Sequence, residues 1–174
     1  MNKKLIFIVS APRSGSTLFL SYLSGLKNTK ILYETKCLTN SLNFSPTNLV
    51  EYLAMLFDSF EEDIVIEKTP EHALHLDVIE QLRKVCKRDI HIVYLVRPPV
   101  PTILSLVKAS KIWRQEEGCC PYEGLLGFCE KYEESLVSIY NNLILRSNKP
   151  NTPIVDKPIY SADVLGNIRE IDSY

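Results

Sequence analysis

The segment Pro12–Thr17 combines the residue types that bind a phosphate group in proteins. It follows the apolar run Leu5–Ser10, which predicts a strand, and a helical pattern begins at Ser16. At such a junction the free backbone N–H groups and the helix dipole attract an anion. A glycine lets the backbone approach the phosphate, hydroxyls donate hydrogen bonds, and an arginine supplies a planar cation. The candidate phosphate-binding residues are Arg13, Ser14, Gly15, Ser16 and Thr17.

This loop differs from the GxxxxGKS/T motif of the nucleoside-triphosphate hydrolases. That motif has two glycines and a lysine before its Ser or Thr, whereas here Gly15 is followed by Ser16. A Mg²⁺-dependent kinase is therefore a weaker interpretation, and it stays open as an alternative. A non-catalytic nucleotide-binding protein is the third hypothesis.

Ionic residues also follow the three other predicted strands, which cover residues 30–34, 63–67 and 90–96. In a parallel sheet the carboxyl ends of the strands share one edge, where ligands bind. We therefore expect these side chains to face the phosphate loop. They are Glu34 and Lys36 after the second strand, Glu67 and Lys68 at the third, and Arg97 after the fourth.

The elements that carry these residues alternate between strands and helices. Such an order predicts an α/β fold, a P-loop-like three-layer domain with a central parallel sheet flanked by helices. The predicted helices are Ser16–Lys27, one from Pro46 behind Ser45, one from Thr69 and Pro70 to about Cys86, Thr102–Lys111, one to about Arg146, and Ser161–Ile171. Pro153–Asp156 is a predicted last strand.

Composition restricts the class of protein. The 174 residues suffice for one domain, and the net charge of −1 gives no overall basic surface for nucleic acid. The apolar run Leu5–Val9 is too short to span a bilayer. The cysteines number five and show no CxxC spacing, which predicts neither a disulfide framework nor a metal site. We therefore expect a protein of the reducing cytoplasm.

The motif Ala-Pro-Arg-Ser-Gly-Ser-Thr at residues 11–17 resembles the 5′-phosphosulfate loop of sulfotransferases that use 3′-phosphoadenosine 5′-phosphosulfate (PAPS). It is especially similar to the loop of the bacterial and tyrosylprotein enzymes. Arg97 and Ser105, eight residues apart, match the pair that holds the 3′-phosphate in this family, although Arg97-Pro-Pro replaces the usual Arg-Asp-Pro. The matched motifs lie between residues 5 and about 110. The resemblance implies one sulfotransferase-like domain over 1–174, with PAPS as co-substrate and no metal.

Sulfuryl transfer, like phosphoryl transfer, needs positioned partners, a base and nearby cations. Glu34 stands where the tyrosylprotein and heparan sulfotransferases carry a catalytic Glu, and Glu34-Thr-Lys resembles the tyrosylprotein Glu-Thr-Arg. We take Glu34 as the base. Glu67 is the alternative candidate for the base, or else it orients Lys68 or Arg13. The segment Glu67-Lys-Thr-Pro resembles one in heparan 3-O-sulfotransferases, which implies that Lys68 contacts substrate near the transferring sulfate. Arg13 is expected to stabilise charge on the bridging phosphate oxygen.

Other features leave the acceptor open among small molecules, sugars and peptides. Trp113 and Tyr122 are candidates to line its pocket. His72 and His75 fall three residues apart on a predicted helix, without a third metal ligand nearby in the sequence. The basic, glycine-containing segment that covers adenosine in longer relatives is not found before Tyr174, so a minimal enzyme, a truncated form and a relative with weakened nucleotide binding all remain possible.

Overall fold

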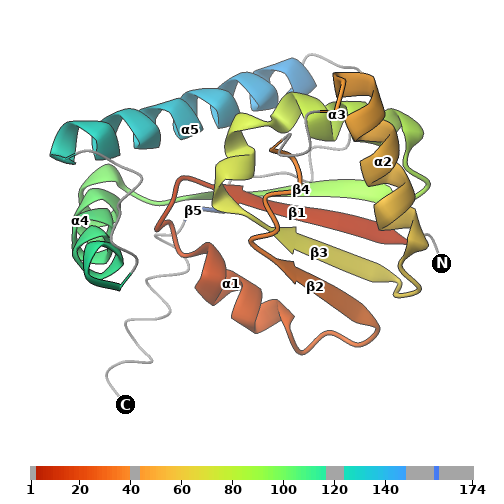
Figure 1. The fold of residues 1–174 in the computed structure, drawn as a ribbon, viewed down its shortest axis with the longest axis horizontal. Helices are drawn as coiled ribbons and strands as arrows, with labels where there is room; N and C mark the ends of the chain where they lie inside the picture. The colour runs from red at the N-terminus through yellow and green to blue at the C-terminus, as the bar shows by residue number, and fades with distance from the viewer. Residues whose placement is uncertain (1–2, 40–43, 117–123, 148–158, 161–174) are drawn as a thin grey trace.

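A computed structural model of the chain describes residues 3–39, 44–116, 124–147 and 159–160 (Figure 1). The strands are β1 (Lys4–Ser10), β2 (Thr29–Tyr33), β3 (Ile64–Lys68), β4 (Asp89–Val96) and β5 (Ile159–Tyr160). The helices are α1 (Ser16–Leu23), α2 (Pro46–Ser59), the 3₁₀ helix η1 (Pro70–Leu74), α3 (Leu76–Val85), α4 (Pro99–Glu116) and α5 (Gly124–Ser147).

The strands form one parallel sheet in the order β2-β3-β1-β4-β5, which confirms the predicted α/β class. β1 lies at the centre, paired with β3 on one side and β4 on the other. Its register sets Ile8 opposite Lys68 and Ser10 opposite Leu95. The carboxyl ends of these strands consequently lie side by side.

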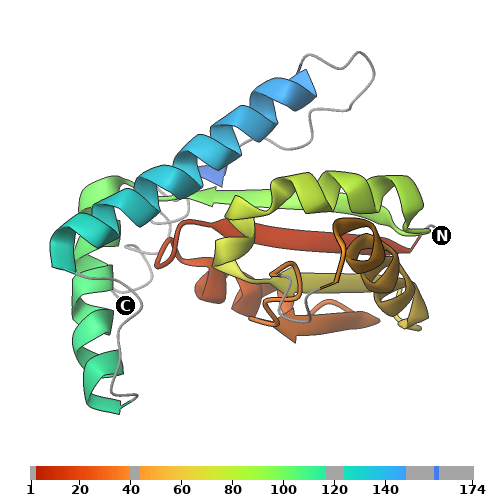
Figure 2. The same cartoon turned by 45° about the horizontal axis from the view of Figure 1, so that its top comes forward.

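Alternation along β1 divides the core between the two faces of the sheet. Leu5, Phe7 and Val9 pack with the apolar residues of α2 and α3, whereas Ile8 packs with Leu20 of α1. Figure 2 shows α3 over the sheet and α1 beneath it. The domain therefore has three layers, as predicted, and α5 runs from α4 across η1 (Figure 1).

Local signals account for where some helices begin and end. The side chain of Ser45 accepts a hydrogen bond from the amide of Asn48 at 3.3 Å, so α2 begins at Pro46 as predicted. α1 ends at Leu23 rather than Lys27. Gly25 disfavours a helix, and Leu26, with 46% of its surface exposed, gains little burial from extending one.

The helix predicted from Thr69 and Pro70 to about Cys86 is divided in two. η1 ends at Leu74, and α3 begins after His75, whose φ of −122° is not helical. The Thr69 hydroxyl does not cap a helix, because it donates to the carboxylate of Glu67 at 2.6 Å. α4 begins at Pro99, three residues before the predicted start.

Several predictions fall outside the described residues. They concern the last strand at Pro153–Asp156, the last helix at Ser161–Ile171 and the side chain of Tyr122. Trp113 lies within α4, although its side chain is not among those described. Among the described helices, none has the length and apolar character needed to cross a bilayer.

Candidate active site

A cavity of about 460 Å³ opens at the carboxyl ends of the strands. It brings together side chains from the loops after β1, β2, β3 and β4 and from helix α4. Parallel pairing explains this convergence, because it sets the four strand ends at one edge. The lining residues are Pro12, Arg13, Gly15, Ser16, Thr17, Leu18, Glu34, Lys36, Lys68, Pro70, Glu71, Arg97 and Ser105.

The loop between β1 and α1 has the geometry of an anion site. Gly15 has a φ of +94°, which other residues rarely adopt, and no atom lies within 4 Å of the position that a β-carbon would take. The amide of Phe19 donates to the carbonyl of Gly15 at 3.0 Å. This is the first hydrogen bond of the helix, so the amides of residues 16–18, which come before Phe19, have no intrahelical acceptor. They can therefore donate to an anion placed beside Gly15.

One residue of this loop does not face the cavity. Ser14 is buried, and its hydroxyl has no hydrogen-bond partner among the described residues. Its amide donates to the carbonyl of Ala11 at 3.2 Å, which tightens the turn. Ser14 is therefore placed to shape the loop, while Arg13, Gly15, Ser16 and Thr17 line the cavity.

Arg97 and Ser105 both meet Arg13 across the cavity. Nη1 of Arg97 donates to the backbone carbonyl of Arg13 at 3.1 Å, and Nε of Arg13 donates to Oγ of Ser105 at 3.2 Å. The backbone carbonyl of Arg97 accepts from the hydroxyl of Tyr132 in α5 at 2.6 Å. Burial raises the pKa of Tyr132 above its usual value, so this hydroxyl keeps its proton. Nε of Arg97 is buried with no partner among the described residues.

Lys68 is a buried cation at the floor of the cavity, with 1% of its side chain exposed. Its Nζ lies 2.5 Å from Oε1 of Glu34 and 4.4 Å from the centre of the Tyr33 ring. A buried ammonium needs a counter-charge, and the aromatic face adds further attraction. Glu34 is 42% exposed and can therefore reach a bound molecule while it neutralises Lys68.

Glu67 lies on the opposite face of the sheet from Lys68, because adjacent residues of a strand alternate. It is fully buried and does not line the cavity. Its Oε1 accepts from the hydroxyls of Thr35 at 2.9 Å and Thr69 at 2.6 Å, and its Oε2 lies 2.7 Å from Nδ1 of His72. Among the described residues, the hydrogen-bond partners of Glu67 are Thr35, Thr69 and His72 rather than Lys68 or Arg13, the two cations that the sequence analysis assigns to it.

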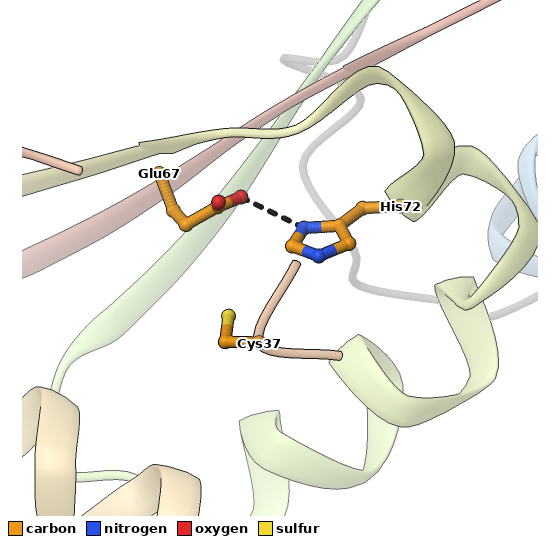
Figure 3. A group of neighbouring side chains, drawn as sticks. All are labelled: Cys37, Glu67 and His72. Atoms are coloured by element: carbon orange, nitrogen blue, oxygen red, sulfur yellow. Dashed lines mark hydrogen bonds and ion pairs between the residues drawn. The ribbon is translucent and has the colours of Figure 1, made fainter. Parts of the chain in front are cut away.

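The side chains of Cys37, Glu67 and His72 gather on this second face (Figure 3). Their ligand atoms lie within 4.8 Å of one another, as those of a metal site could. Nε2 of His72, however, accepts from the amide of Leu38 at 3.3 Å, and Nδ1 faces Glu67, so both ring nitrogens are engaged. Burial and the charge of Glu67 raise the pKa of Cys37 to about 12, which keeps the thiol protonated. The cluster is therefore held by hydrogen bonds.

Sequence reasoning missed the partnership of Glu67 with His72. It placed His72 and His75 on one helix face, but His75 lies at the junction after η1, where burial lowers its pKa. It also missed Glu71 in the cavity lining and Tyr33 beneath Lys68. The spacing of Glu67 and His72 across Pro70 is the only signal that could have linked them.

The half-buried thiols of Cys37 and Cys86 give a testable expectation. Burial raises the pKa of Cys37 to about 12 and that of Cys86 to about 11, so at pH 8 both are protonated and react slowly. Iodoacetamide should alkylate both at least about tenfold more slowly in the native protein than in urea, because the pKa falls to about 8.5 on unfolding. Peptide mass spectrometry measures both rates. Equal rates in the two states would contradict the burial of these thiols.

No family model matches the chain, and no curated protein matches it in sequence. Solved structures do match. The sulfotransferase domain from the curacin biosynthetic pathway has a TM-score of 0.64 at 20% identity, covering 98% of this chain and 71% of that domain. The sulfotransferase domain of the Synechococcus PCC 7002 olefin synthase has a TM-score of 0.57 at 16% identity, covering 97% and 70%.

A putative kinase from Chloroflexus aurantiacus J-10-fl also matches, with a TM-score of 0.54 at 12% identity over 98% of both chains. At these identities the likeness concerns the fold. The chain thus has the P-loop-like α/β fold that these sulfotransferase domains and the putative kinase share.

Proposed function

We propose that this chain is a PAPS-dependent sulfotransferase, formed by a single domain over residues 1–174. The observation that carries the proposal is the Glu34–Lys68 ion pair, which faces the same cavity as the anion-binding loop. A base, a buried cation and a phosphate site within one cavity are the parts that sulfuryl transfer requires.

The nucleotide is proposed to bind in this cavity, with different residues holding its 5′-phosphosulfate and its 3′-phosphate. Backbone amides of residues 16–18 would hold the 5′-phosphosulfate, since they have no intrahelical acceptor and the space beside Gly15 is open. Arg97 and Ser105 would hold the 3′-phosphate, which needs a cation and a neutral donor. Arg13, whose Nε donates to Oγ of Ser105 at 3.2 Å, lies beside both proposed phosphate positions and can attract either anion.

The reaction is proposed as an in-line displacement. Glu34 takes the proton of the acceptor hydroxyl or amine as its oxygen or nitrogen bonds to sulfur. The bond between sulfur and the bridging oxygen breaks, and that oxygen leaves with adenosine 3′,5′-bisphosphate. Arg13 and Lys68 stabilise the charge that develops on the transferring group and the leaving oxygen. The proton passes from Glu34 to solvent, which restores its pair with Lys68.

A phosphate kinase is the second candidate, favoured by the match to the putative kinase over 98% of both chains. The two activities differ in their need for metal, since kinases use Mg²⁺ bound to substrate phosphates. The loop here has no lysine after Gly15, and a cation reaches the cavity instead from Lys68.

Calorimetric titration tests the proposal. Adenosine 3′,5′-bisphosphate should bind tightly, with the same affinity in EDTA as in Mg²⁺, and at least about tenfold more tightly than AMP, the difference expected for one charged hydrogen bond. A preference for ATP with Mg²⁺ would favour the kinase. Binding of the bisphosphate without turnover of any acceptor would favour a non-catalytic protein.

A further inference from the structure

The loop that carries Glu34 adopts a conformation that its residues do not favour. Glu34 has a φ of +48° and Lys36 a φ of +53°, both in the left-handed region, where a β-carbon meets backbone atoms. Such conformations persist only where the surrounding structure holds them. The chain that follows β2 must therefore be fastened to something rigid.

The fastening comes from Glu67 and its neighbours beneath the loop. Oγ1 of Thr35 donates to Glu67 at 2.9 Å and accepts from the amide of Cys37 at 3.3 Å. Oγ1 of Thr69 donates to Glu67 at 2.6 Å and accepts from the amide of Lys36 at 3.3 Å. Each hydroxyl thus links the buried carboxylate of Glu67 to one backbone amide of the loop.

His72 links Glu67 to the end of the loop in a similar way. An amide can only donate, so Nε2 of His72, which lies 3.3 Å from the amide of Leu38, must be an acceptor without a proton. The ring proton therefore sits on Nδ1 and points to Oε2 of Glu67, 2.7 Å away. Figure 3 shows the imidazole turned in this way between Glu67 and the Cys37 segment. Only the tautomer with its proton on Nδ1 is compatible with both contacts.

We infer that Glu67 and His72, with the hydroxyls of Thr35 and Thr69, are positioning residues that hold the loop 34–38 in its strained form and so aim Glu34 into the cavity. This inference rests on the proposed function for its catalytic consequence. Glu67 and His72 touch no substrate, because both are fully buried on the far face of the sheet. Their effect reaches Glu34 only through the backbone, which is also tied to β3 by the bond from the Glu34 amide to the Lys68 carbonyl at 2.8 Å.

The first test reads the tautomer of His72 in the unaltered protein. Nitrogen-15 NMR of the imidazole should show a protonated Nδ1 and an unprotonated Nε2. The opposite tautomer, or a ring protonated on both nitrogens at neutral pH, would overturn the inference, since Leu38 would then lack its acceptor. This measurement needs no acceptor and no turnover.

The second test uses Glu67→Gln, which keeps the size of the side chain but offers one acceptor oxygen in place of two. Either His72 or the threonines then lose their acceptor, and amide hydrogen exchange at Lys36 or Leu38 should accelerate. We expect kcat to fall about 10²-fold, as for a displacement of about 1 Å, with bisphosphate affinity unchanged. Glu61→Gln, at an exposed position before β3, is the matched control and should alter neither.

The remaining outcomes separate this inference from the proposed function. Unchanged exchange and unchanged kcat in Glu67→Gln would overturn the positioning role. If Glu67→Gln does not fold, Thr35→Val removes one arm of the network at the exposed loop and should give the same pattern. If the unaltered protein transfers no sulfuryl group, the proposed function fails, while the tautomer and the exchange rates still decide whether the loop is held in this way.

Discussion

Glu34→Gln is expected to lower kcat for sulfuryl transfer by about 10²- to 10⁴-fold, the usual contribution of a general base. Glutamine cannot take up the acceptor's proton, but its carbonyl oxygen can still accept from Lys68. The fold and the nucleotide site should therefore remain intact. Single-turnover kinetics with PAPS and calorimetry with adenosine 3′,5′-bisphosphate measure the two quantities separately.

The same substitution at Glu51, an exposed residue of α2, serves as the matched control and should leave both quantities unchanged. A Glu34→Gln protein with full turnover would mean that another group removes the proton. A protein that lost bisphosphate binding as well would mean that Glu34 supports the loops rather than the chemistry.

Arg97→Ala is expected to weaken binding of adenosine 3′,5′-bisphosphate by about 10- to 150-fold, the range for a hydrogen bond to a charged group. AMP, which has no 3′-phosphate, should lose far less. Some loss is expected for both nucleotides, because Nη1 of Arg97 also holds the carbonyl of Arg13 at 3.1 Å. Calorimetry with both nucleotides measures the loss of affinity for the bisphosphate relative to the loss for AMP.

Arg97→Lys provides the comparison for this prediction. It keeps the charge but loses the planar fork, so its affinity for the bisphosphate should fall between those of the unaltered protein and Arg97→Ala. Equal losses for AMP and the bisphosphate in Arg97→Ala would remove Arg97 from the 3′-phosphate site and leave it as a support of the phosphate loop.

Much of the fold followed from local patterns in the sequence. Alternating strand and helix signals predicted a parallel sheet, and polar residues after each strand predicted one ligand edge. The cavity indeed collects Arg13, Glu34, Lys68 and Arg97. Their convergence could be predicted because parallel strands have a simple rule for where their ends lie.

The assignment of Glu67 shows where such reasoning ends. Its position at the end of β3 predicted the shared edge, but which face its side chain takes depends on the register of β3 against β1. Its partner His72 lies in η1, a 3₁₀ helix that the sequence analysis does not separate from α3. These are tertiary choices, and no local propensity encodes them.

Arg88 illustrates the same limit for cations. Arg88 directly precedes β4 and Arg97 directly follows it. Arg88, however, is buried and donates to the backbone carbonyls of Phe57, Phe60 and Glu62. Composition alone cannot separate an arginine that serves the backbone from one that lines a cavity.

The opposite orientations of Glu67 and Lys68 in β3 have a consequence for how this sequence can diverge. Deleting one codon upstream of them within β3 would exchange the faces of both residues, since strand side chains alternate. The ammonium of Lys68 would then take the place of Glu67 beside Thr35 and His72, and Thr69 would take the place of Lys68 beside Glu34. Both faces would fail through one event, so insertions and deletions in this lineage should collect in the connecting segments and spare β3.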